Sequence, residues 1–156
     1  MTTEIERKFL VKEEFKKFTT KNYKIVQGFL STVPERTVRV RIRDDKGFIT
    51  VKGLSNKSGT TRFEWEKEIA IDEAQKLLEL CEPTIIEKIR YIIPTTHDLY
   101  FEIDEFLGKN SGILIAEIEL PSENFQFEKP NWLGKEVTGE VKYYNSMLAK
   151  KPFSTW

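Results

Sequence analysis

Residues Thr37–Arg43 read TVRVRIR, a stretch in which arginine and apolar residues alternate. Successive side chains of an extended strand point to opposite faces, so Arg39, Arg41 and Arg43 share one face and the apolar residues share the other. The stretch TRFEWEKEI, Thr61–Ile69, alternates in the same way with mostly acidic residues on the polar face. Such strands predict a sheet with one apolar face and one densely charged face.

Eight segments of the chain show this alternation in some degree and are predicted strands. They are Thr3–Val11, Tyr23–Val33, Thr37–Arg43, Phe48–Leu54, Thr61–Ile71, Ile85–Ile93, Leu99–Phe106 and Ile113–Pro121. Short turns rich in Gly, Asp and Asn join several of them, which predicts antiparallel neighbours. The apolar spacing of Asp72–Cys81 predicts a helix with Asp72 as its N-cap, and two further short helices are expected at Lys12–Phe18 and Lys142–Lys150.

The predicted fold is α+β and mainly β, with residues 1–156 forming a single domain. We expect an eight-stranded antiparallel β-barrel that is closed on itself, because closure removes exposed strand edges. The barrel would have a charged interior and a few outer helices. A two-layer α+β sheet is the alternative.

Composition excludes several classes of protein. Lys plus Arg and Asp plus Glu are both 25, so no global positive charge exists to attract nucleic acid or an anionic membrane. One cysteine and one histidine exclude an intramolecular disulfide and a cysteine-based zinc site. Charges at Glu4, Glu6, Arg7 and Lys8 occupy the place where a signal peptide needs apolar residues, so we expect a cytoplasmic protein.

Arginine is enriched over lysine on the charged face of the predicted strands. This face takes five of the chain's seven Arg but only three of its 18 Lys. Solvent exposure does not favour arginine so strongly, whereas bidentate recognition of phosphate does. The simplest alternative is a solvated outer face around an apolar-cored barrel. The face comprises Glu4, Glu6, Lys8, Arg39, Arg41, Arg43, Lys52, Arg62, Glu64, Glu66, Glu68, Lys88, Arg90, Glu102, Asp104, Glu117 and Glu119.

Charges of like sign are also grouped on the same strand. An arginine row and glutamate rows repel themselves unless other groups neutralise them. Phosphate oxygens would neutralise the arginines, and divalent cations the glutamates. Carboxylate ligands favour Mg²⁺ or Mn²⁺ over zinc, and an eight-stranded barrel has room for one small ligand. The residues therefore predict a bore that binds a metal-complexed polyphosphate.

These segments resemble the signatures of the CYTH superfamily, the triphosphate tunnel metalloenzymes. The similarity begins with EIERKFLV at Glu4–Val11, the ExExK pattern, and continues in order along nearly the whole chain. The further segments are RVRIR, TVKG, FEWE, EKIRY, FEIDEF and AEIEL. The resemblance implies an eight-stranded tunnel that acts on triphosphates with Mg²⁺ or Mn²⁺, and it is greatest for the short bacterial tripolyphosphatases.

The resemblance also implies roles for individual residues. The expected metal ligands are Glu4, Glu6, Asp104, Glu117 and Glu119. The expected phosphate-binding residues are Lys8, Arg39, Arg41, Lys52, Lys88 and Arg90, and the expected catalytic residues are Glu64, Glu66, Lys52 and Lys88. Weaker candidates are Arg43, Arg62, Glu68, Glu102 and Glu140. Two positions depart from the group: Phe29 stands where a tyrosine is common, and Glu140 where an aspartate is common.

The expected activity is hydrolysis of inorganic tripolyphosphate to diphosphate and phosphate by in-line attack of water. A class IV-type adenylate cyclase, a thiamine triphosphatase and a non-catalytic polyphosphate-binding module are the alternatives. The expected partner is a small triphosphate, and we expect no nucleic acid and no membrane. The sequence predicts no oligomeric state.

Overall fold

The computed structural model describes residues 2–156, which form nine strands, two α-helices and five short 3₁₀ helices. The strands are β1 (Thr2–Val11), β2 (Lys21–Ser31), β3 (Thr37–Arg43), β4 (Lys46–Lys52), β5 (Thr61–Ile69), β6 (Glu82–Pro94), β7 (Tyr100–Phe106), β8 (Leu114–Glu119) and β9 (Leu133–Glu136). The helices are α1 (Ile71–Glu79), α2 (Asn145–Lys150), η1 (Lys16–Phe18), η2 (Pro34–Arg36), η3 (Gly108–Asn110), η4 (Val141–Tyr143) and η5 (Phe153–Thr155). Within the described residues, no helix is long and apolar enough to cross a membrane.

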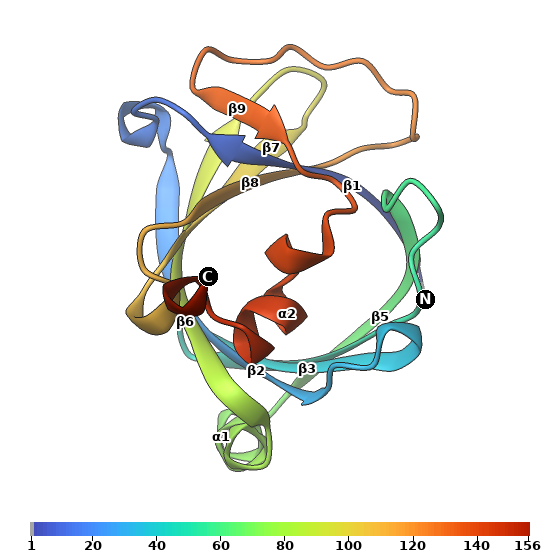
Figure 1. Cartoon of the computed structure of the whole chain (residues 1–156), viewed down its shortest axis with the longest axis vertical. Helices are drawn as coiled ribbons and strands as arrows, with labels where there is room; N and C mark the ends of the chain where they lie inside the picture. Colours follow the sequence, from blue (N-terminus) through green and yellow to red (C-terminus); the bar gives the residue numbers. More distant parts are fainter. Residues whose placement is uncertain (1) are drawn as a thin grey trace.

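The first eight strands close into an antiparallel barrel (Figure 1). Their order is β5-β4-β3-β2-β6-β7-β8-β1, and the ring closes where Thr2–Ile5 of β1 pair with Thr61–Glu64 of β5. Residues 6–10 of β1 pair with β8 on the other side. The predicted eight-stranded barrel is confirmed. Strand β9, which was not predicted, pairs with β1 at Phe9 and Val11.

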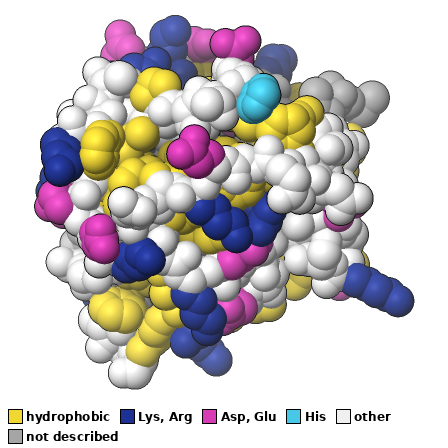
Figure 2. Space-filling view, turned by 90° about the horizontal axis from the view of Figure 1, so that it is seen from above, with side chains coloured by type: hydrophobic (Ala, Val, Ile, Leu, Met, Phe, Trp, Pro, Cys, Tyr) yellow, Lys and Arg dark blue, Asp and Glu magenta, His cyan; other side chains and the backbone are white. Residues whose placement is uncertain are grey.

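The main hydrophobic core lies outside the barrel wall. The apolar faces of β1, β7 and β8 pack against the segment that follows β8 and against the chain around η1. The core residues are Phe9, Phe15, Ile93, Phe101, Ile103, Ala116, Ile118, Leu120, Trp132 and Leu133. Figure 2 shows the molecule turned by 90° about the horizontal axis of Figure 1, so that it is seen from above, and hydrophobic side chains there are interspersed with charged ones. Because the apolar faces are used on the outside, the charged faces point inward.

Helix α1 lies outside the barrel against β2, β3 and β4 (Figure 1). It approaches closely because Gly47 has no side chain: a Cβ there would lie 2.6 Å from that of Ala74. The helix begins at Ile71, so the predicted N-cap, Asp72, was wrong by two residues. The carboxylate of Glu73 instead accepts a hydrogen bond from the backbone N–H of Ala70.

Helix α2 lies within the ring of strands (Figure 1), so the prediction of outer helices holds for α1 and was wrong for α2. Its buried residues Leu148 and Ala149 pack against inward-facing apolar side chains of the barrel, including Phe29, Ile86 and Phe106. These side chains fill one part of the bore with a second hydrophobic cluster. The other part keeps its charged lining.

Candidate active site

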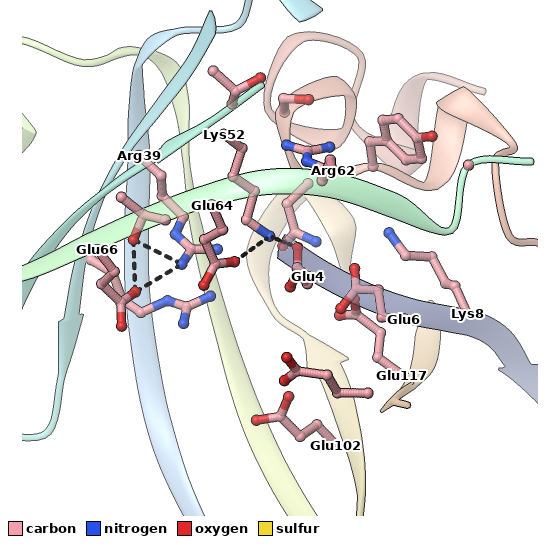
Figure 3. Close-up of a pocket in the computed structure, with 18 of the residues that line it drawn as sticks. Glu4, Glu6, Lys8, Arg39, Lys52, Arg62, Glu64, Glu66, Glu102 and Glu117 are labelled. Carbon is pink, nitrogen blue, oxygen red and sulfur yellow. Dashed lines mark hydrogen bonds and ion pairs between the residues drawn. The ribbon is translucent and has the colours of Figure 1, made fainter. Parts of the chain in front are cut away.

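A cavity of about 240 Å³ occupies the charged part of the bore (Figure 3). All eight strands of the barrel contribute lining residues, because the inward positions of each strand recur with a period of two. The charged lining residues are Glu4, Glu6, Lys8, Arg39, Arg41, Arg43, Lys52, Arg62, Glu64, Glu66, Lys88, Arg90, Glu102, Glu117 and Glu119. Exposure falls from Glu66, whose side chain is 40% exposed, to Lys88, which is 1% exposed, so the cavity has an open and a deep end.

The arginines of β3 line one wall. Arg39 donates from Nη2 to Thr50 Oγ1 at 3.1 Å and contacts Glu66 Oε1 at 3.4 Å. Its Nε is buried without a partner among the described residues, and so is Nε of Arg62. Burial lowers the pKa of Arg41 to about 9, helped by the neighbouring charges of Arg39 and Arg90. Buried donors without partners and cations packed together indicate a site prepared for an anion.

Lys52 links the basic wall to the acids (Figure 3). Its Nζ lies 2.9 Å from Glu4 Oε2 and 3.3 Å from Glu64 Oε2. Burial opposes the charge of Lys52, but Glu4 and Glu6 outweigh it, and the pKa of Lys52 is raised. Burial also raises the pKa of Glu64, and Lys52 offsets only part of this. Glu64 is thus a better proton acceptor than an ordinary glutamate.

A cluster of buried charged side chains lies at the deep end of the cavity. Arg90 donates from Nε and Nη2 to the two oxygens of Asp104 at 2.7 and 2.8 Å. Lys88 Nζ lies 2.7 Å from the same carboxylate, which is 1% exposed. Asp104 does not line the cavity, because both of its oxygens face these two cations. Burial lowers the pKa of Lys88 to about 7, although Asp104 opposes this shift.

Acidic residues face one another across the strands of the opposite wall. Glu6 lies directly opposite Glu119 in the β1–β8 pair, and Glu102 directly opposite Glu117 in the β7–β8 pair. Burial raises the pKa of Glu6 well above its usual range, and the charges of Glu117 and Glu4 add to this. Burial would raise the pKa of Glu117 too, but the charge of Lys8 and a hydrogen bond from Glu6 bring it well below normal. Burial and mutual repulsion thus favour the neutral form of Glu6, while the neighbouring cation and Glu6 itself favour the charged form of Glu117.

This acidic wall fits a divalent cation in the chemistry of its donors. Like charges placed directly opposite each other destabilise a sheet unless a positive charge lies between them. Carboxylate oxygens are the donors that Mg²⁺ and Mn²⁺ prefer. Within residues 2–156, no three acidic, histidine or cysteine side chains already converge as a formed ion site. These carboxylates are therefore the right type of ligand for a divalent cation and lie next to one another. Their side chains would have to rotate to coordinate the same ion.

The raised pKa of Glu6 leads to a testable prediction for the metal-free protein. The folded state holds Glu6 protonated over a pH range in which the unfolded chain has lost that proton, so folding stability falls as the pH rises above the unfolded pKa. Glu6→Gln removes this penalty and keeps a donor toward Glu117. We expect the variant to unfold at a higher temperature than the parent at pH 7.5, and the difference to shrink toward pH 4.

Thermal unfolding with a chelator present measures this, and Glu87→Gln on an exposed face is the matched control. Equal unfolding temperatures of the Glu6→Gln variant and the parent at pH 7.5 would show that no carboxylate repulsion exists in the bore.

Most of the residues expected from the sequence meet in this cavity. Of the expected set, three do not line it: Asp104, Glu68 and Glu140. Glu68 is exposed at the end of β5, and the side chain of Glu140 is 41% exposed, with Lys135 as its ion-pair partner at 4.0 Å. The weaker candidates Arg43, Arg62 and Glu102 do line the cavity. Phe29 also lines it and belongs to the hydrophobic cluster at α2.

Several neutral residues of the site were missed. Thr50 donates to Glu66 Oε1 at 2.7 Å and accepts from Arg39, so it holds those two side chains together. Gln27 and Asn145 contact Arg41 and Lys88 at the deep end. The alternation of β4 offers a signal for Thr50, since it is inward-facing two positions before Lys52. Nothing in the sequence near Asn145 indicates that its helix enters the barrel.

Comparison with known proteins gives consistent matches. The model of the CYTH domain family matches residues 2–150. A relative from Acetivibrio thermocellus, named inorganic triphosphatase, is 46% identical over 157 residues, which cover 100% of this chain and 99% of the relative. A second, from Nitrosomonas europaea and also named inorganic triphosphatase, is 34% identical over 94% of this chain and 97% of its own. The solved structure of the inorganic triphosphatase NE1496 matches with a TM-score of 0.67 and 32% identity, covering 94% of this chain and 97% of that one.

Proposed function

The chain belongs to the CYTH domain family, and from that premise we propose that it is a divalent-metal-dependent hydrolase of inorganic triphosphate. Two full-length relatives carry the name inorganic triphosphatase. The single structural observation that supports the proposal best is the bore itself, where arginines on one wall face glutamates on the other across a cavity. A small, highly charged anion together with cations would neutralise both walls.

The basic wall binds the triphosphate. Arg39 and Arg41 are phosphate ligands, and the unpartnered Nε of Arg39 is the donor available to a phosphate oxygen. Lys52 reaches the cavity between the two walls. The remaining members of the proposed phosphate-binding set are Lys8, Lys88 and Arg90, all of which line the cavity.

The acidic wall would hold the divalent cation. Glu4, Glu6, Glu117 and Glu119 are the proposed ligands, with Mg²⁺ or Mn²⁺ as the ion. When bound, the cation would offset the negative charge of the triphosphate and polarise its oxygens. Asp104 is assigned a different role, because its oxygens already bind Arg90 and Lys88. It favours the charged forms of those two side chains and holds them in place.

Hydrolysis proceeds by in-line attack of water on a terminal phosphoryl group. Glu64 is the proposed general base, since burial raises its pKa and it lies at the cavity beside Lys52. Glu66 orients Arg39, with Thr50 between them. Lys52 and Lys88 stabilise the negative charge that develops on the transferred and leaving oxygens.

Trp132 and Trp156 offer no stacking surface to a nucleoside or thiamine ring in the cavity, whose aromatic lining residues are Phe29, Tyr100 and Tyr144. Trp132 is buried in the core outside the barrel wall, and Trp156 is an exposed residue packed on Tyr143 and Phe153. Neither lines the cavity.

The expected cytoplasmic location, the absence of nucleic-acid and membrane partners, and the extent of the domain over residues 1–156 stay predictions.

A substrate panel tests the function. Tripolyphosphate, ATP, thiamine triphosphate and long-chain polyphosphate are each incubated with Mg²⁺ or Mn²⁺, and phosphate and cyclic AMP are measured. We expect tripolyphosphate to give the highest kcat/KM, no cyclic AMP, and no turnover after chelation of the metal. Cyclic AMP from ATP, or turnover of thiamine triphosphate above that of tripolyphosphate, would replace the proposal with the corresponding alternative.

A further inference from the structure

Two side-chain amides lie between the deepest cations of the bore. Gln27 is inward-facing on β2 and fully buried, and Asn145 is the first residue of α2. Gln27 Oε1 accepts a hydrogen bond from Arg41 Nε at 3.0 Å, and Gln27 Nε2 donates to Asn145 Oδ1 at 2.9 Å. The same oxygen of Asn145 accepts from Lys88 Nζ at 2.8 Å. A chain of three hydrogen bonds therefore connects Arg41 to Lys88.

The donors at both ends fix the orientation of the two amides. Arginine and lysine only donate, so Gln27 must turn its oxygen toward Arg41 and Asn145 its oxygen toward Lys88. Nε2 of Gln27 then faces the oxygen of Asn145, which completes the chain without a mismatch. Reversing either amide would place two donors against each other. The distance between Arg41 and Lys88 is consequently set by this chain of hydrogen bonds through the two amides.

The neutrality of this bridge matters for a site that binds an anion. Lys88 already has one carboxylate partner, Asp104, at 2.7 Å. A carboxylate in place of Asn145 would still accept both of its hydrogen bonds, and one in place of Gln27 would still accept from Arg41 but could not donate to Asn145. At either position it would cancel positive charge and repel phosphate. An amide supplies the acceptor and leaves the charge available. The effect of adding a negative charge at these positions therefore distinguishes a positioning role for the amides from a role in packing alone.

We propose that Gln27 and Asn145 are positioning residues that hold Arg41 and Lys88 at a fixed spacing for one phosphate group of the substrate. The proposal rests on the proposed triphosphatase function and adds to it the two amides and helix α2. Because Asn145 is carried by α2, the seating of that helix through Leu148 and Ala149 sets the geometry of the anion site. The C-terminal segment is thereby part of the binding machinery.

Charge-changing and neutral substitutions at the two amides test the proposal. Asn145→Ala removes the shared acceptor, and we expect it to raise KM for tripolyphosphate on the order of tenfold, with a smaller change in kcat. Asn145→Asp keeps the shape and the acceptor but adds a negative charge. We expect it to raise KM further than Asn145→Ala does. At Gln27, Gln27→Glu should likewise be worse than Gln27→Met, which matches the glutamine in size and carries no charge.

A purely structural role would give the opposite ranking, since the closest shape would then be tolerated best. Leu133→Ala, in the core outside the barrel wall, is the matched control, because it lowers stability without touching α2, an amide or a charge, and thermal unfolding is recorded for every variant. The proposal is overturned if Asn145→Asp binds at least as well as Asn145→Ala, or if Leu133→Ala raises KM as much at equal loss of stability.

Direct titration of tripolyphosphate in the absence of metal separates this test from that of the proposed function. It measures the Kd of each variant whether or not hydrolysis occurs. If the parent enzyme fails to hydrolyse tripolyphosphate, the proposed function falls, and the ranking of the Kd values still decides the role of the two amides.

Discussion

Replacing Glu117 by glutamine is expected to lower kcat/KM for tripolyphosphate by a factor on the order of 10²–10³, the cost of losing one preorganised charged contact in an active site. Glu117 lines the cavity directly opposite Glu102 and Lys8, and a hydrogen bond from Glu6 helps to keep its pKa low. Glutamine keeps the size of the side chain and removes the charge that a cation would require. The fold should therefore persist while metal-dependent turnover is lost.

Steady-state kinetics over a range of Mg²⁺ and Mn²⁺ concentrations measure this effect. Part of the lost activity should return at high metal concentration if the defect lies in metal binding. Glu68→Gln is the matched control, since Glu68 is exposed on β5 and does not line the cavity. A Glu117→Gln enzyme with the parental rate and the parental metal dependence would contradict the assignment of the acidic wall.

Replacing Asp104 by asparagine is expected to lower the free energy of unfolding by about 3–5 kcal/mol, the usual cost of removing one partner from a buried ion pair. Lys88 and Arg90 would lose their common carboxylate, and Arg90 would keep only Glu102 at 3.1 Å and the more distant Glu117 as anionic partners. Added tripolyphosphate should stabilise this variant more than the parent, because the anion replaces the missing charge. Urea unfolding at pH 7 with a chelator present measures both effects.

Glu105→Gln provides a comparison on the same strand. Its carboxylate is partly exposed on the opposite face and lies 3.5 Å from Lys16 Nζ, and such a surface pair contributes at most about 1 kcal/mol. If Asp104→Asn leaves metal-free stability unchanged and weakens only metal binding, Asp104 is a metal ligand, as the sequence alone predicted.

Strand alternation was enough to assign most of the charged face to the interior. A period of two cannot place one of Arg39 and Arg41 inside without the other, so a single strand with one apolar face fixes the whole row. Alternation does not predict which groups an inward-facing side chain contacts. Asp104 is inward-facing, but its register directly opposite Arg90 turns its oxygens to a cation and away from the cavity. Glu68 has the same parity as Glu66 and falls beyond the cavity.

Contacts that depend on tertiary packing could not be predicted. Gln27 carries no charge and stands in a strand whose alternation is weak, so nothing distinguishes it from a structural residue. The position of α2 inside the barrel follows from the packing of Leu148 and Ala149 on apolar side chains of distant strands. Strand β9 has four residues and pairs only with the end of β1, which is too short for a periodic signal.

The claim that the charged faces enclose a shared binding site is tested most directly by a crystal structure of the protein with tripolyphosphate and Mn²⁺, using the anomalous scattering of manganese. The predicted result is a manganese peak beside Glu6 and Glu117, with phosphate density in the bore against Arg39 and Arg41. Manganese and phosphate bound only on the outer surface, with an empty bore, would contradict the account.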